Sequence, residues 1–94
     1  MPDPLDDAAI DAALAELDGW ERDGDTIHKV FQFDDFSAAF GFMARMALVS
    51  EKADHHPDWS NTYNKVTVNL SSHDAGGVTQ RDLDWATAAD RISA

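Results

Sequence analysis

Residues 59–71, WSNTYNKVTVNLS, carry the pattern on which the fold depends. Val66, Val68 and Leu70 alternate with polar residues, so a strand over 65–71 has one apolar and one polar face. Residues 59–63 form the expected partner strand, with the turn around Asn64. This hairpin predicts a sheet that is covered on one face and open on the other.

A second hairpin is indicated upstream, around Asp23-Gly24, because this dipeptide favours tight turns. Its strands are expected over 20–22 and 26–33. The apolar residues of the longer strand, Ile27, Phe31 and Phe33, share one face.

Three helices are expected around the hairpins. Asp6 or Asp7 caps the first, which ends at Gly19 and presents Ile10, Leu14 and Leu17. The last spans 79–92 and follows a flexible link at 75–77; its packing residues are Leu83, Trp85, Ala86, Ala89 and Ile92. The order helix, hairpin, helix, hairpin, helix predicts an α+β fold, a four-stranded antiparallel sheet with three helices packed on one face.

The central helix, expected over 36–53 and capped by Asp34 or Asp35, is apolar on two sides. One side holds Phe36, Phe40, Met43 and Ala47, and the other holds Phe42, Met46 and Val49. Two apolar faces need two partners, the chain's own sheet and a second subunit. We therefore expect a homodimer or homotetramer; the alternative is a helix enclosed within its own domain.

The composition narrows the class of protein. The 94 residues suit a single domain over 1–94, and the absence of cysteine excludes disulfides. A formal net charge of −11 argues against binding to nucleic acid or to an anionic membrane surface. No stretch has the apolar length of a membrane span, so a cytoplasmic protein is expected.

The candidate catalytic residues are histidines. His55 and His56 precede Pro57, which favours extended backbone, so the two rings should face different surroundings. Imidazoles held differently can act one as acid and the other as base near neutral pH. A His-His-Pro in a surface loop can equally be structural. His73 is a further candidate, and His28 is interpreted as a surface strand residue.

Asp82 fits a capping box with Thr79 at the start of the last helix, a structural role that is compatible with a place in the site. Three histidines and an aspartate could also hold a metal. However, the chain has no HExxH motif and no histidine pair spaced four residues apart on a helix. No metal site is therefore expected.

These residues form a spaced signature. Glu51, three residues, His55-His56-Pro57, five residues to Tyr63, nine to His73 and eight to Asp82 resembles the pterin-4a-carbinolamine dehydratase family. The strings HHPDWSNTYNKVTVNL and SSHDAGGVTQRDLDWA are similar to the family as well. Val78 and Trp85 depart from it, at positions that concern packing around the last helix.

The resemblance implies dehydration of 4a-hydroxytetrahydropterin to quinonoid dihydropterin, in a pathway with aromatic amino acid hydroxylases and without metal or organic cofactor. It makes His55 and His73 the acid–base pair. His56 would bind and orient the pterin, and Asp82 would fix an imidazole. Trp59 and Glu51 are expected near the substrate, although Trp59 could be a core aromatic and Glu51 could simply end the central helix.

Two other functions stay open. Animal members of the family are dimerisation cofactors of a homeodomain transcription factor, so the resemblance also allows a protein-binding module. A pterin enzyme in molybdenum-cofactor supply is the other alternative.

Overall fold

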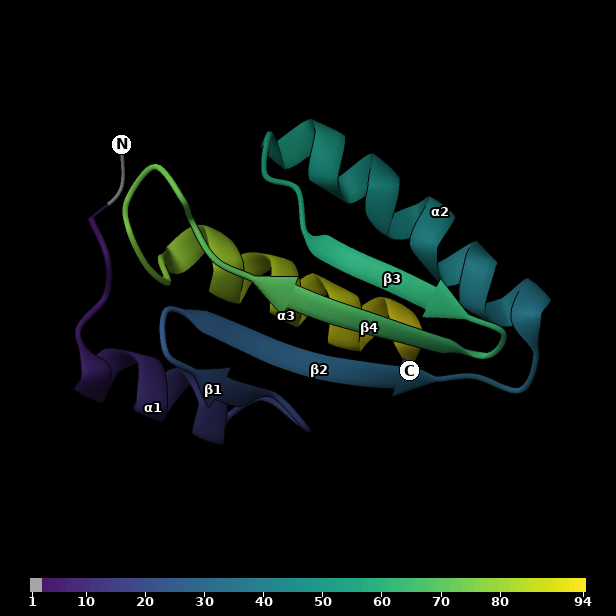
Figure 1. Cartoon of the computed structure of the whole chain (residues 1–94), viewed down its shortest axis with the longest axis horizontal. Helices are drawn as coiled ribbons and strands as arrows, with labels where there is room; N and C mark the ends of the chain where they lie inside the picture. The colour runs from purple at the N-terminus through teal and green to yellow at the C-terminus, as the bar shows by residue number, and fades with distance from the viewer. Residues whose placement is uncertain (1–2) are drawn as a thin grey trace.

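The computed structural model describes residues 3–94, so Met1 and Pro2 of the predicted 1–94 domain lie outside the described residues. Within that range the chain forms three helices and four strands, in an α+β arrangement (Figure 1). In chain order they are α1 Asp7–Ala15, β1 Glu21–Asp23, β2 Thr26–Gln32, α2 Phe36–Ala53, β3 Asp58–Thr62, β4 Lys65–Leu70 and α3 Gln80–Ser93. The predicted fold class is confirmed.

The strands form one antiparallel sheet in the order β1-β2-β4-β3. β4 is therefore central and pairs with β2 on one side and with β3 on the other. Both predicted hairpins are present, and the limits of their strands differ from the predicted limits by at most one residue. The first turn is Gly24-Asp25 and not Asp23-Gly24, because Asp23 still pairs with Thr26 and Gly24 supplies the positive φ of +61°.

The core lies on one face of the sheet. Register brings Ile27 of β2 opposite Leu70 of β4, and Phe31 opposite Val66, and all four side chains are buried. Ile10 of α1, Phe42 of α2 and Trp85 of α3 belong to the same core cluster. The three helices thus cover the face that the alternation in 65–70 predicted to be apolar, and in Figure 1 α3 runs behind β2 and β4.

α2 has the predicted limits because both ends carry strong signals. Asp35 caps its start and accepts a hydrogen bond from the Ala38 amide at 2.8 Å. Asp54 ends it in the left-handed conformation, at φ 51°. The Phe42 side of the helix is buried, whereas Phe36 and Phe40 on the other side are about half exposed, at 49% and 56%.

α1 is shorter than predicted. It begins after Asp6, as expected, but ends at Ala15, and Glu16 is its C-cap. Gly19, four residues after Ala15, has a φ of +81°, so this glycine shapes the turn into β1 and does not end the helix. Leu17 packs partly against the core from outside the helix.

The predicted flexible link at 75–77 is a closed turn. The Ser72 carbonyl accepts hydrogen bonds from the Ala75 and Gly76 amides, and Ser72 also forms a bridge with Gly77. This turn fixes the chain between β4 and α3, where His73 lies.

Candidate active site

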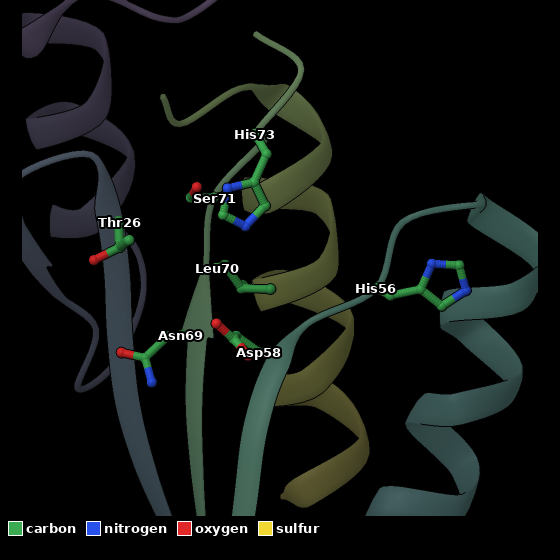
Figure 2. Close-up of a pocket in the computed structure, with 7 residues that line it drawn as sticks. All are labelled: Thr26, His56, Asp58, Asn69, Leu70, Ser71 and His73. Carbon is green, nitrogen blue, oxygen red and sulfur yellow. The ribbon is translucent and has the colours of Figure 1, made fainter. Parts of the chain in front are cut away.

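A hollow lies at the end of β4, beside the segment that connects α2 to β3. It is lined by Thr26, His56, Asp58, Asn69, Leu70, Ser71 and His73, and its interior holds about 40 Å³. Figure 2 shows these residues coming from β2, β3, β4 and the segments that flank them. Small-molecule pockets are commonly about 300–1,000 Å³, so a bicyclic ligand would lie mostly outside this shallow hollow.

Two of the predicted histidines line this hollow. His73 and His56 are both exposed, and they come from segments 17 residues apart in sequence. In Figure 2 the His73 ring turns back toward Ser71 and Leu70, while the His56 ring turns toward α2. His56 Nε2 lies 2.6 Å from Glu51 Oε1, so the predicted site residue Glu51 holds His56 in place from the last turns of α2.

His55 lies elsewhere. Its ring is buried, and it lines a second hollow with Val49, Ala53, Arg81, Asp84 and Trp85. The neighbouring rings of His55 and His56 therefore face different surroundings, as extended backbone before proline predicts. The structure brings His56, and not His55, to the hollow that contains His73.

Asp82 organises the region between the two hollows. Its side chain is fully buried, and Oδ1 lies 2.6 Å from His55 Nε2. Oδ2 accepts hydrogen bonds from Ser72 Oγ and from the Thr79 amide, both at 2.9 Å. Asp82 therefore caps α3, as predicted, and also joins His55 to the residue that precedes His73.

The proton positions in this network follow from the acceptors. Since a carboxylate oxygen only accepts, His55 donates from Nε2, and its Nδ1 is left as the free ring nitrogen. Ser72 uses its one hydrogen on Asp82, so Thr79 must donate its hydroxyl hydrogen to Ser72 Oγ, 2.8 Å away. With the His55 hydrogen on Nε2, each of these hydrogen bonds has one donor and one acceptor.

Trp59 is part of the core side of the sheet. Register pairs it with buried Val68, and its ring meets Trp85 edge-on at 6.0 Å between centroids. It does not line the hollow of His56 and His73. The interpretation of Trp59 as a core aromatic therefore describes its contacts in this structure.

The sequence interpretation missed several polar residues that line the hollow: Thr26, Asp58, Asn69 and Ser71. A signal for two of them was present, because Asn69 and Ser71 share the strand alternation with His73. His28, interpreted as a surface strand residue, lies partly buried on β2. Its Nδ1 lies 2.9 Å from Asn69 Oδ1, so His28 contacts a residue of the hollow.

One ion pair lies beside the second hollow, between Arg81 and Asp74. Arg81 Nη2 donates to Asp74 Oδ1 at 2.7 Å, and this hydrogen bond holds the pKa of the Asp74 carboxyl below its ordinary value.

Among residues 3–94, no three histidine, aspartate or glutamate side chains gather in a way that could hold a metal ion. In the same part of the chain, every helix is too short or too polar to cross a membrane.

Comparison with known proteins gives consistent matches over the whole described chain. Residues 3–92 match the family model of pterin 4 alpha carbinolamine dehydratase. A relative from Afipia carboxidovorans, provisionally named pterin-4-alpha-carbinolamine dehydratase, is 55% identical, and the match covers 100% of this chain and 96% of the relative. A relative from Rhodospirillum rubrum with the same provisional name is 50% identical, with 98% of each chain covered.

Solved structures agree with these matches. The crystal structure of a transcriptional coactivator/pterin dehydratase from Brucella melitensis superposes with a TM-score of 0.95 at 44% identity, covering 98% of this chain and all of that one. A pterin dehydratase-like protein described as a RuBisCO assembly factor of the alpha-carboxysome shares the fold, with a TM-score of 0.69 at 20% identity; the match covers 80% of this chain and 89% of that one.

Proposed function

The chain belongs to the pterin 4 alpha carbinolamine dehydratase family, and from this membership we propose that it converts 4a-hydroxytetrahydropterin to quinonoid dihydropterin and water. The observation that supports the proposal most directly is the hollow shared by His56 and His73. Two imidazoles from separate segments at one hollow provide the groups that this dehydration requires.

The reaction needs one proton delivered and one removed. The C4a–O bond breaks and the hydroxyl leaves as water when a general acid protonates it. A base takes the proton from the adjacent ring nitrogen, and the carbon–nitrogen double bond forms. A charged imidazole can supply the first proton and a neutral one can accept the second, both near pH 7.

We assign these two steps to His73 and His56, because both line the hollow. This differs from the expectation that His55 and His73 form the pair. In its described position His55 is bound to Asp82 at a second hollow, where it supports the segment that carries His73. Glu51 orients His56 through a 2.6 Å hydrogen bond.

Single substitutions test the assignment. Dehydration of a chemically prepared carbinolamine is followed by absorbance for His73→Gln, His56→Gln and His55→Gln, with chelator present throughout. Loss of an acid or base typically lowers the rate about 10²–10⁴-fold, so the first two variants should fall by that factor. His55→Gln should fall much less. Gln32→Ala, an exposed change on β2 outside the hollow, is the control.

The results separate the possibilities. If His55→Gln loses as much rate as His73→Gln while His56→Gln does not, the expected pair of His55 and His73 is right and our assignment is wrong. If none of the three variants loses rate, histidine acid–base catalysis itself is excluded.

For the physiological role we propose recycling of the pterin used by aromatic amino acid hydroxylases. The alternative is a pterin enzyme in molybdenum-cofactor supply. Comparing kcat/KM for the 4a-hydroxy derivatives of tetrahydrobiopterin and of a phosphorylated pterin distinguishes them. A preference for the phosphorylated compound would favour the alternative.

The exposed side of α2 supports a second proposal, that the chain forms homodimers or homotetramers. Phe36 and Phe40 lie against each other with ring centroids 5.8 Å apart, and Leu48 further along the helix is 73% exposed. Light scattering should give a mass above the 10.3 kDa monomer, and Phe40→Ser with Leu48→Ser should lower it. A monomeric wild type that binds another protein through these residues would favour a protein-binding module.

A further inference from the structure

A row of polar side chains crosses the open face of the sheet beside the histidine hollow. Strand register places His28 of β2 opposite Asn69 of β4, and Asn69 opposite Asp58 of β3. Asn69 and Asp58 also line the hollow (Figure 2). The proton transfers assigned to the histidines use none of these three residues.

The hydrogen bond to His28 decides which end of the Asn69 amide is available. His28 Nδ1 lies 2.9 Å from Asn69 Oδ1, so the imidazole donates and the amide oxygen is occupied. Figure 2 shows this oxygen turned toward β2. The planar amide then directs its Nδ2 hydrogens away from His28, and among the described residues Nδ2 donates to no other side chain or carbonyl. Asn69 therefore offers a hydrogen-bond donor.

Asp58 offers the complementary groups next to this donor. Residues directly opposite in an antiparallel pair have Cβ atoms about 4.5–5.5 Å apart, so the Asp58 carboxylate lies beside the Asn69 amide. The pyrimidinone edge of a pterin presents two neighbouring donors, the 2-amino group and N3–H, followed by one acceptor, the 4-oxo group. A carboxylate beside an amide donor matches this order.

We propose that Asp58 and Asn69 recognise this edge of the pterin. Asp58 accepts from the 2-amino group and N3–H, and Asn69 Nδ2 donates to the 4-oxo group. His28 is a positioning residue that acts through Asn69. This inference rests on the proposed function, and it deepens that proposal by naming what selects the pterin.

The arrangement also orients the reacting carbon. C4a is bonded to C4, which bears the oxo group that Asn69 would hold. Asn69, Ser71 and His73 follow one another along the same side of β4 and its extension, and Figure 2 shows the His73 ring turned back toward Ser71. In this proposal the rest of the pterin extends from Asn69 past Ser71 toward His73, so that C4a lies on the His73 side of the hollow.

The test compares two stable ligands that differ at position 4. 7,8-Dihydropterin carries the oxo acceptor and a hydrogen on N3, whereas 2,4-diamino-7,8-dihydropteridine carries an amino donor at position 4 and no hydrogen on N3. The Kd of each is measured by fluorescence titration. Wild type should bind the oxo compound about tenfold tighter or more, because the diamino compound mismatches the Asn69 donor and one of the Asp58 acceptor contacts. Asn69→Asp replaces the donor with an acceptor, so the ratio of the two Kd values should fall toward one.

The positioning role of His28 is tested by the same quantity, the ratio of the Kd of the diamino compound to the Kd of the oxo compound. In His28→Ala the Asn69 amide can present either end, so the ratio should fall toward one. His28→Gln keeps a donor near the Asn69 oxygen and should restore much of the preference. Gln32→Ala, on the same strand and the same open face, is the control and should match wild type.

The outcomes separate this inference from the proposed function. If wild type binds the pterin and dehydrates the carbinolamine, but Asn69→Asp and His28→Ala keep the wild-type ratio while folded by circular dichroism, this inference is wrong and the dehydratase proposal stands. If wild type binds neither ligand and does not dehydrate the carbinolamine, the proposed function is wrong and this inference falls with it.

Discussion

Replacement of Asp82 by alanine should be among the most damaging single changes in this chain. The fully buried carboxylate accepts hydrogen bonds from His55, from Ser72 and from the Thr79 amide. In Asp82→Ala the Ser72 hydroxyl can still bond with Thr79, but the His55 ring and the Thr79 amide lose their acceptor. Each unsatisfied buried donor costs about 1–3 kcal/mol, so the two donors together cost about 2–6 kcal/mol. We expect a loss of about 3–5 kcal/mol.

Urea and thermal unfolding, followed by far-ultraviolet circular dichroism, measure this loss. For a domain of this size about 1 kcal/mol corresponds to 4–8 °C, so the midpoint should fall by roughly 15–30 °C. Asp84→Ala removes an exposed carboxylate from the same helix and should stay within about 0.5 kcal/mol of wild type. An Asp82→Ala protein as stable as the Asp84→Ala control would refute the view that this carboxylate holds the three segments together.

Three further changes can be checked by unfolding measurements. Ser50→Ala leaves Trp85 Nε1 without its 2.9 Å acceptor and should cost about 1–3 kcal/mol, with a change in tryptophan fluorescence. Phe42→Ala empties the centre of the core and should cost about 3–5 kcal/mol in urea; under 1 kcal/mol would contradict its described burial. Asp74→Asn removes a carboxyl whose pKa is lowered by Arg81. The lowered pKa stabilises the fold above the ordinary aspartate range, so the variant should be less stable at neutral pH, and the difference should close as acid protonates Asp74 in wild type.

Local signals in the sequence were sufficient for most of the fold. The start of α2 was predicted because an aspartate cap precedes a largely apolar stretch, and the structure shows that Asp54 ends the helix at the predicted place. The alternation of Val66, Val68 and Leu70 fixed the buried face of the sheet. α1 was predicted too long, because a glycine with positive φ can serve a turn as well as a helix end, and the sequence does not distinguish the two.

The site was harder to predict because it depends on contacts between distant segments. Spacing identified His55, His56, His73 and Asp82 as a group, but not which histidines would share a hollow. The pairing of His28 with Asn69 depends on the register between β2 and β4, which local patterns do not contain. A polar strand residue such as Asn69 appears solvent-exposed until its neighbours across the sheet are known.

The carboxylate that fixes His55 lies 27 residues further along the chain, in α3, which follows both hairpins. During synthesis the ribosome therefore completes the four strands before Asp82 can join the fold. A nascent or prematurely terminated polypeptide that lacks this helix has both strands of each hairpin but no anchor for the His55 ring. We therefore expect truncated translation products that lack α3 to be inert toward the pterin.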